Sequence, residues 1–166
     1  MDIILENSLV VIVMGVSGCG KTTVGKMLAD TLKGSFFDAD DFHPKENIAK
    51  MSKGLPLTDE DRSGWLEILA EHLKKREAEG VTVLACSALK EKYRTTLSKD
   101  LKNCKWVWLH GSYELIYKRM TQREGHYMSQ DLLKSQFDIL EEPAYALKVD
   151  IGSNPEQIIN QIKSWI

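Results

Sequence analysis

The sequence predicts an α/β fold, a three-layer sandwich in which helices on both sides enclose a five-stranded parallel β-sheet. Apolar runs of strand length alternate along the chain with stretches of helical periodicity, and this alternation is typical of α/β domains. The apolar runs are short and almost continuous, as in parallel strands that are covered on both faces. No repeat, low-complexity tract or linker interrupts them, so we expect a single domain over residues 1–166.

The expected strands and helices follow one another in a regular order. The strands are predicted at residues 9–14, 35–38, 81–86, 106–110 and 147–151. The helices are predicted at about residues 20–33, 44–52, 59–79, 90–99, 112–123, 130–141 and 155–165. Because helical sequence separates each strand from the next, the strands are expected to run parallel.

Two of the expected helices begin with residues that cap a helix. Thr58 precedes three acidic residues, which suit the positive N-terminal end of the helix dipole. Asn154 is a good N-cap and stands before Pro155, which suits the first helical position. Five apolar residues of the long central helix are expected to line one buried face: Trp65, Leu66, Ile68, Leu69 and Leu73.

The composition is that of a soluble globular protein and argues against two classes of partner. The formal net charge is −2, which does not suit a general nucleic-acid or membrane-surface binder. The first residues include Asp2 and Glu6 and no basic stretch, so they do not resemble a signal peptide, and no apolar run reaches the roughly 18–20 residues that span a bilayer. Cys19, Cys86 and Cys104 are odd in number and lack metal-site spacing, which suggests reduced thiols. We therefore expect a cytoplasmic protein.

A glycine-rich segment, GVSGCGKT at residues 15–22, joins the first expected strand to the first helix. It fits the pattern GxxxxGKS/T of the phosphate-binding loop, or P-loop, in which backbone N–H groups face phosphates, the lysine reaches the β- and γ-phosphates and the hydroxyl binds Mg²⁺. The alternative is a chance glycine turn, but the strand–loop–helix context favours a P-loop NTPase. The predicted nucleotide-binding residues of the loop are Gly15, Val16, Ser17, Gly18, Cys19, Gly20, Lys21, Thr22 and Thr23.

The surroundings of the loop narrow the type of P-loop protein. A GTPase needs an NKxD segment, which does not occur. The DRSG stretch at residues 61–64 does match the GTPase pattern DxxG, but it follows polar residues rather than an apolar strand, so we treat the match as chance. A Walker-B strand would end in a carboxylate, whereas residues 81–87 end without one. The carboxylates nearest to a Mg²⁺ site are therefore expected within residues 36–41, at the C-terminal end of the second strand, where parallel sheets bind ligands.

Polar residues are dense between residues 38 and 66, and we interpret this stretch as the acceptor side of a phosphate-transfer site. Asp38 and Asp40 point the same way if the segment is extended, because side chains alternate along a strand. One carboxylate can then hold a Mg²⁺-bound water while the other receives a hydroxyl proton. The alternative is that Asp38, Asp40 and Asp41 only cap the next helix.

Two further side chains of this stretch are candidates for binding the acceptor. Arg62 offers a planar, two-donor fork that suits a carboxylate; the alternative is a surface ion pair with Asp59 or Glu67. His43 can hydrogen-bond a polyol, although an isolated histidine is as often structural.

Several longer motifs carry a resemblance to a known family. Two blocks are far more specific than the P-loop: HPxxN…KMxxGxPLxDxDRxxWL within residues 43–66 and SQFxxLExP within residues 135–143. Together with CSALKEKYR at residues 86–94 and RMTQREGHYM at residues 119–128, they make the chain resemble the gluconokinases over nearly its whole length. It departs from the family at Cys19, where a small residue is usual, at Gly64, where proline is frequent, and in the lid sequence HYMS, commonly HFMP. No departure removes a charged group.

The resemblance implies a nucleoside-monophosphate-kinase-like fold with a mobile lid at approximately residues 119–135. It implies that Mg²⁺-ATP phosphorylates D-gluconate at its terminal C6 hydroxyl, which gives 6-phospho-D-gluconate and ADP for the pentose phosphate and Entner–Doudoroff routes. It also implies a homodimer. The runner-up is another small-metabolite kinase, of the shikimate or adenylylsulfate type, and a different class is a nucleotide-binding regulator without turnover.

The family's residue roles carry over onto the matching positions. Lys21 would hold the phosphates of ATP, with Mg²⁺ bound by Thr22 and, through water, by Asp38. Asp40 would accept or orient the C6 hydroxyl proton, and Arg62 would bind the gluconate carboxylate.

Further residues complete the expected site. In the lid, Arg119 would stack on adenine, whereas Arg123 and His126 would close over the γ-phosphate, with Arg123 counted as catalytic beside Lys21 and Asp40. The alternative for Arg119 is a solvated helix residue. The additional substrate contacts are expected from His43, Ser87, Lys90 and Arg94, and the alternative for the last three is a helix start with solvated basic residues.

Overall fold

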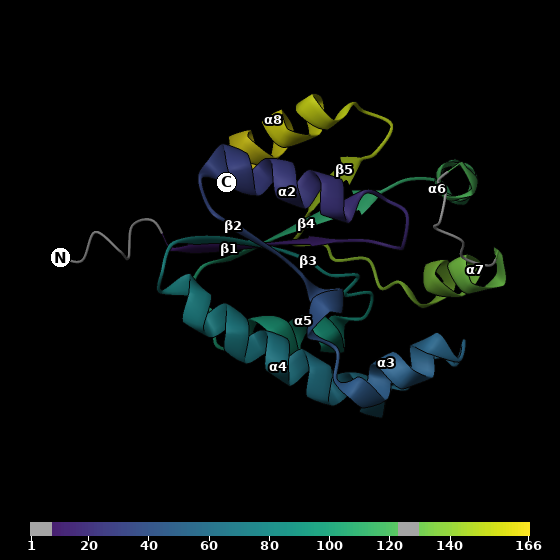
Figure 1. The fold of residues 1–166 in the computed structure, drawn as a ribbon. Helices are drawn as coiled ribbons and strands as arrows, with labels where there is room; N and C mark the ends of the chain where they lie inside the picture. The colour runs from purple at the N-terminus through teal and green to yellow at the C-terminus, as the bar shows by residue number, and fades with distance from the viewer. Residues whose placement is uncertain (1–7, 123–129) are drawn as a thin grey trace.

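The computed structural model describes residues 8–122 and 130–166. Within these residues the sheet has five parallel strands in the order β2-β3-β1-β4-β5 (Figure 1). The strands are β1 (Leu9–Met14), β2 (Ser35–Asp38), β3 (Val81–Ala85), β4 (Cys104–His110) and β5 (Leu147–Asp150). The predicted parallel sheet is confirmed, although β4 begins at Cys104 rather than at residue 106.

Helices cover both faces of the sheet and also gather at one of its ends. Figure 1 shows α2 and α8 on one face and α4 and α5 on the other, so the sheet is the middle of three layers. The remaining helices, α3, α6 and α7, lie toward the end at which the strands finish. The described helices are α2 (Lys21–Leu32), the 3₁₀ helix η1 (Ala39–Phe42), α3 (Lys45–Ser52), α4 (Asp59–Glu77), α5 (Glu91–Ser98), α6 (Tyr113–Thr121), α7 (Gln130–Ile139) and α8 (Pro155–Trp165).

The central strand β1 explains why the first apolar run is continuous. All six of its residues are buried, because the strand lies in the middle of the sheet with helices on both faces. Successive side chains point to opposite faces. Val11 and Val13 therefore join the core beneath α2 and α8, whereas Val10 and Ile12 join the core beneath α4 and α5. This strand holds the loop that follows it in a fixed position.

The predicted caps are confirmed. The Thr58 hydroxyl accepts a hydrogen bond from the Asp61 N–H at 3.1 Å, and the Asp61 carboxylate accepts one from the Thr58 N–H at 2.9 Å. Asn154 forms the same reciprocal arrangement with Gln157 at the start of α8. These bonds satisfy N–H groups that have no partner within the helix.

One expected core residue of α4 is wrong. Ile68 is 44% exposed, whereas Leu69 and Leu73 are completely buried. At about 100° per residue, Ile68 lies on the far side of the helix from the centre of the buried stripe. The stripe comprises Trp65, Leu66, Leu69, Ala70, Leu73 and Glu77.

Candidate active site

The P-loop lies between the end of β1 and the start of α2, as the sequence predicts, and its path depends on glycine. Gly15 has φ 147°, and a Cβ atom there would lie 2.6 Å from the carbonyl oxygen of Leu109 on the neighbouring strand β4. Gly20, the N-cap of α2, has φ 96° in the left-handed region. A side chain at either position would strain the backbone. The first turn of α2 is thereby aimed into the space beyond the strand ends.

Lys21 lies across the loop from which it projects. Its ammonium donates hydrogen bonds to the carbonyl oxygens of Gly15 at 3.0 Å and Val16 at 2.9 Å. Next to it, the Thr22 hydroxyl donates to Asp38 Oδ2 at 3.2 Å, which joins the P-loop helix to the end of β2. The side chain of Val16 is buried in the core, so this residue offers the loop only its backbone.

A cavity of about 400 Å³ opens on one side of the P-loop. Arg119 is fixed in its wall, because its guanidinium donates to the carbonyl oxygen of Ile151 at 2.8 Å. A flat guanidinium with apolar neighbours suits the face of an aromatic ring. Its position in the wall contradicts the alternative of a fully solvated helix residue. The cavity is lined by Gly18, Cys19, Gly20, Thr23, Val24, Arg119, Gln122, Ile151, Ser153, Pro155 and Ile158.

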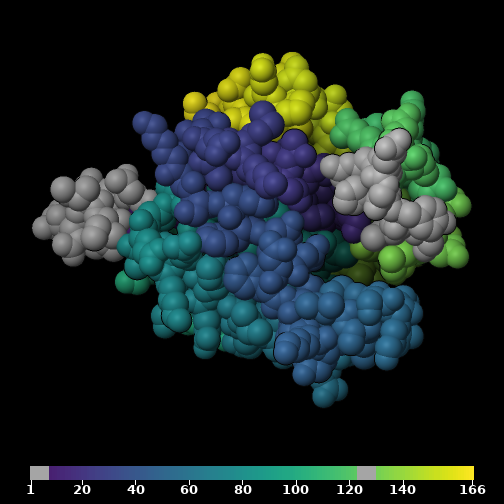
Figure 2. Space-filling model, in the orientation of Figure 1, coloured from purple at the N-terminus to yellow at the C-terminus, as the bar shows by residue number. Residues whose placement is uncertain are grey.

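A second cavity, of about 360 Å³, opens on the other side of the loop at the C-terminal ends of β1, β2 and β3. Figure 2 shows this face of the molecule hollowed between the blue surface of the α3 region and the purple surface of the P-loop region above it. The cavity brings residues of the P-loop, among them Lys21 and Thr22, together with three predicted residues from other segments, Asp38, Asp40 and Ser87. We refer to it as the transfer cleft.

The backbone around Asp38 differs from the expected extended form. Residues 39–42 form the 3₁₀ helix η1, and Asp38 Oδ1 accepts a hydrogen bond from the N–H of Asp40 at 3.0 Å. The argument from strand alternation is therefore wrong. Asp38 caps η1, a helix that the sequence analysis did not expect, whereas the expected helix α3 has Pro44 at its N-cap and no side-chain cap. Both carboxylates nevertheless line the transfer cleft, because the turn that Asp38 caps places Asp40 beside it.

Asp40 has the electrostatic environment of a proton acceptor. Its pKa is raised from the ordinary value of 3.8 by desolvation in the cleft and by the negative charge of Asp38, while His43 and Lys21 act in the opposite direction. The side chain is still 85% exposed. Because so exposed a carboxylate keeps most of its hydration, we give the neighbouring charge of Asp38 more weight than desolvation.

His43 is a structural residue that faces Asp40. Its side chain is only 3% exposed and stacks on Trp65 with the ring centroids 4.1 Å apart. The Asn47 amide nitrogen donates to the backbone oxygen of Asp61 and lies 3.2 Å from His43 Nδ1, which therefore accepts and leaves the ring proton on Nε2. That nitrogen lies 3.8 Å from Asp40 Oδ1. Burial lowers the pKa of His43, so the ring is neutral near pH 7.

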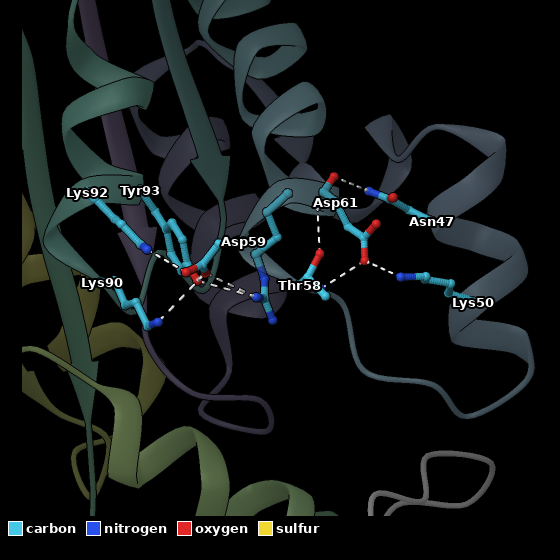
Figure 3. A network of polar contacts seen from close by, with 9 residues as sticks. Asn47, Lys50, Thr58, Asp59, Asp61, Lys90, Lys92 and Tyr93 are labelled. Atoms are coloured by element: carbon cyan, nitrogen blue, oxygen red, sulfur yellow. Dashed lines mark hydrogen bonds and ion pairs between the residues drawn. The ribbon is translucent and has the colours of Figure 1, made fainter.

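Arg62 lies outside the walls of both cavities and belongs to a cluster centred on Asp59. Figure 3 shows Lys90, Lys92 and Tyr93 of this cluster around Asp59. The Arg62 guanidinium donates to the Tyr93 hydroxyl at 3.3 Å and lies 3.8 Å from Asp59. Asp59 also accepts hydrogen bonds from Lys92 and Tyr93 and lies 3.7 Å from Lys90. The bonds from Lys92 and Tyr93 hold the pKa of Asp59 far below its usual range. The structure therefore contains the ion pair with Asp59 that was the alternative interpretation of Arg62.

Arg94 is the clearest correction among the predicted substrate contacts. The residue is 1% exposed, and its guanidinium donates to the backbone oxygens of Ala88 at 2.7 Å and Glu141 at 2.8 Å and to the Tyr145 hydroxyl at 2.8 Å. It also pairs with Glu91 at 3.0 Å. Its donors are occupied by the protein, so Arg94 supports the loop before α5 and has no free face for a ligand.

The site contains one residue that the sequence motifs included without a role. Gln136 on α7 makes two hydrogen bonds with Ser17 of the P-loop. The SQF block contained the signal, but a motif alone does not say what its glutamine contacts. Arg123 and His126, and with them the middle of the expected lid, lie outside the described residues.

The described residues suit a nucleotide-bound Mg²⁺ better than a protein-bound metal. Within residues 8–122 and 130–166, no group of three or more His, Cys, Asp or Glu side chains is placed to hold an ion. Mg²⁺ commonly takes one or two protein ligands and completes its shell with water and substrate phosphates. The neighbouring oxygens of Thr22 and Asp38 match that requirement.

No described helix is long and apolar enough to cross a membrane.

Known proteins resemble this chain over most of its length. It is 44% identical to the thermosensitive gluconokinase of Escherichia coli strain K12, over 93% of this chain and 86% of that protein. It is 45% identical to the gluconokinase of Arabidopsis thaliana, over 95% and 92%. The crystal structure of a gluconokinase from Sinorhizobium meliloti has a TM-score of 0.84 at 39% identity, covering 93% of this chain and 89% of that one. The chain belongs to the gluconokinase family.

This gluconokinase-family chain is also related to the shikimate kinases, through the fold. A family model described as shikimate kinase matches residues 17–166. The crystal structure of shikimate kinase from Aquifex aeolicus has a TM-score of 0.61 at 18% identity, covering 95% of each chain. At that identity the likeness shows a shared P-loop kinase fold alone.

Proposed function

We propose that this member of the gluconokinase family transfers the γ-phosphate of ATP to the C6 hydroxyl of D-gluconate, giving 6-phospho-D-gluconate and ADP for the pentose phosphate and Entner–Doudoroff routes. The observation that carries the proposal is the transfer cleft, where Lys21 and Thr22 of the P-loop face the Asp40 carboxylate. Phosphoryl transfer asks the protein mainly for positioning and charge neutralisation. A cleft that a phosphate-binding loop shares with a proton acceptor meets both needs.

The nucleotide side uses the P-loop and the neighbouring cavity. Lys21 exchanges its bonds to the loop carbonyls for bonds to the β- and γ-phosphates. Thr22, and Asp38 through water, would hold the Mg²⁺ ion, which would supply positive charge at the phosphates. The cavity walled by Arg119 and Ile151 takes the adenine ring.

The acceptor side uses Asp40 as the group that receives or orients the C6 hydroxyl proton. Its raised pKa brings it closer to that of a useful general base. The Nε2 atom of His43 lies 3.8 Å from Asp40 Oδ1. His43 is thus proposed to act on the substrate through Asp40. Ser87 lines the same cleft and is available to the polyol.

The gluconate carboxylate is assigned to the cluster around Asp59. Three cationic side chains, Arg62, Lys90 and Lys92, converge there on one carboxylate, which leaves an excess of positive charge. Tyr93 accepts from Arg62 and donates to Asp59, so the arginine is already oriented. At 3.8 Å the Arg62 guanidinium is too far from Asp59 for a hydrogen bond, so it can pair with a substrate carboxylate through two N–H groups.

The roles of two lid residues and the oligomeric state also remain proposals. Arg123 and His126 are proposed to close over the γ-phosphate, as in the family's lid. The homodimer is proposed from the family resemblance, and light scattering during gel filtration tests it directly.

A coupled assay of ADP release tests the proposed function. The protein is supplied with Mg²⁺-ATP and, in separate reactions, with gluconate, shikimate, adenylylsulfate and nucleoside monophosphates. We expect turnover with gluconate and only background release with the others. Turnover with shikimate or adenylylsulfate instead would assign the chain to that kinase type, and release with none of them would favour a nucleotide-binding regulator.

A further inference from the structure

Gln136 connects two parts of the site that are far apart in the sequence. It lies on α7, and its amide oxygen accepts a hydrogen bond from the Ser17 N–H of the P-loop at 2.7 Å. Its amide nitrogen donates to the Ser17 hydroxyl oxygen at 3.1 Å. The chemistry proposed above does not use Gln136, although this residue belongs to the SQFDILEEP block, which is far more specific than the P-loop motif.

The two bonds determine which way the Ser17 hydroxyl points. A backbone N–H can only donate, so the Gln136 atom that faces it is the oxygen, and the NH₂ group therefore faces the hydroxyl. Because the NH₂ group can only donate, the Ser17 oxygen accepts and its own hydrogen is directed elsewhere. Ser17 lines the transfer cleft. Gln136 thus occupies the Ser17 N–H and leaves the hydroxyl hydrogen available to the cleft.

Gln136 is supported by a helix that is anchored on both sides of the cleft. Leu133, one turn earlier on α7, is completely buried. Just beyond the helix, the Glu141 N–H donates to the Leu89 carbonyl at 2.8 Å, and the Glu141 carboxylate accepts from the Glu91 N–H at 2.7 Å. Leu89 and Glu91 lie in the segment that starts at Ser87, and the Ser87 carbonyl accepts a hydrogen bond from the Gly15 N–H of the P-loop at 3.3 Å. The C-terminal part of α7 therefore ties the P-loop to the loop that precedes α5.

We propose that Gln136 is a positioning residue for the γ-phosphate: it holds Ser17 so that the serine hydroxyl donates a hydrogen bond to that phosphate. The inference rests on the proposed kinase function. Ser17 lines the transfer cleft, beside Asp40, and is absent from the wall of the cavity that contains Arg119. Its hydroxyl is therefore placed for the phosphate nearest to the acceptor, and Gln136 acts on that phosphate only through Ser17.

Nucleotide binding tests the proposal without any turnover. Affinities for ADP and for a non-hydrolysable ATP analogue are measured by titration calorimetry in Ser17→Ala, Gln136→Met, the double variant and wild type. A hydrogen bond to a charged group is worth about tenfold or more in affinity. We expect each single variant to weaken binding of the ATP analogue about tenfold and to leave ADP affinity within about threefold. The double variant should be no weaker than the singles, because both remove one contact.

The control and the contrary results are equally specific. Gln161→Met makes the same substitution at an exposed position of α8, outside the lid and the walls of both cavities, and should leave both affinities unchanged. Equal losses for the two nucleotides would mean that the variants only loosen the loop, and that result would overturn the proposal. So would unchanged affinity of Ser17→Ala for the ATP analogue. That variant keeps the Ser17 N–H bond to Gln136, so it decides the matter even if thermal melting shows that Gln136→Met does not fold.

Failure of this inference can be separated from failure of the proposed function. If wild type does not phosphorylate gluconate but the variants lose affinity for the ATP analogue selectively, the substrate assignment is wrong and the role of Gln136 stands. If wild type phosphorylates gluconate and the selective loss is missing, only the role of Gln136 is wrong.

Discussion

The nucleotide side and the acceptor side of the transfer cleft are built in different ways. The P-loop takes its path mainly from the backbone, with positive-φ glycines between a buried strand and a helix, and a few bonds from distant residues such as Gln136 add to it. The acceptor side takes its shape from side chains that contact one another across several helices. The path of the P-loop backbone is therefore encoded mainly by neighbouring residues, whereas the arrangement of the acceptor side depends on contacts between distant segments.

Asp61 shows how the acceptor side is assembled. Its carboxylate caps α4 through the Thr58 N–H and also pairs with Lys50 of α3 at 2.6 Å (Figure 3). The bonds from Lys50 and Thr58 lower the pKa of Asp61 to about 2, so the pair stays charged in neutral solution. One residue therefore joins α3 to the start of α4. Asp59, two residues earlier, joins the same helix start to α5.

The largest expected effect comes from the proton acceptor. Asp40→Asn removes the base but keeps the size of the side chain, and we expect kcat to fall by about 10²–10⁴. The KM for ATP should change little, because Asp40 belongs to the acceptor side of the cleft. Steady-state kinetics with gluconate measure both. Asp41→Asn, at the neighbouring exposed carboxylate, is the matched control. An unchanged kcat in Asp40→Asn rules this residue out as the base.

The second prediction concerns Arg94, whose effect should be on stability. Arg94→Met leaves the buried carbonyl of Ala88 without its partner and removes the bonds to the Glu141 carbonyl and to Glu91, so we expect the free energy of unfolding to fall by about 1–3 kcal/mol. Urea denaturation measures this change. Lys99→Met, which breaks the exposed pair with Glu67, should cost only about 0–1 kcal/mol. A strongly raised gluconate KM in folded Arg94→Met protein would restore its role as a substrate contact.

The third prediction separates the two sides of the cleft directly. Arg62→Ala should raise the KM for gluconate by about 10- to 100-fold, because a charged hydrogen-bond donor to the carboxylate is lost. The KM for ATP should stay near that of wild type. Arg76→Ala provides a control on the same helix, since Arg76 pairs with Glu79 and lines neither cavity. A large loss of ATP binding in Arg62→Ala is incompatible with the assigned role.

The smallest expected effect is a shift of the acidic limb of the pH–activity profile to higher pH. The pKa of Asp40 is raised above 3.8, and the base works only when ionised. Activity should therefore be complete above this raised pKa and fall as the pH drops through it, at a higher pH than for an ordinary aspartate. The profile of kcat/KM for gluconate against pH reports this value for the free enzyme. A limb at or below pH 3.8 would contradict the proposed electrostatic environment.

The sequence was a good guide to the strands, the helix starts and the P-loop. Each of these depends on residues that are close together in the chain: apolar runs, capping side chains and glycines. It was a poorer guide to Asp38 and Asp40, because an extended segment and a capped 3₁₀ turn are compatible with the same few residues. It misplaced Arg94 for a similar reason, since a basic residue that follows a loop gives no sign of the carbonyls that surround it in the folded chain.

By itself, the sequence determined a parallel α/β sheet with a phosphate-binding loop, and its long motifs pointed to the gluconokinase family. Only the tertiary structure decided which polar side chains are free to meet a ligand. Arg94 is used up inside the protein, Arg62 is shared with Asp59, and Gln136 reaches Ser17 from a distant helix. Backbone geometry follows from neighbouring residues, whereas the partner of a long polar side chain depends on which distant segments the fold brings within hydrogen-bonding distance.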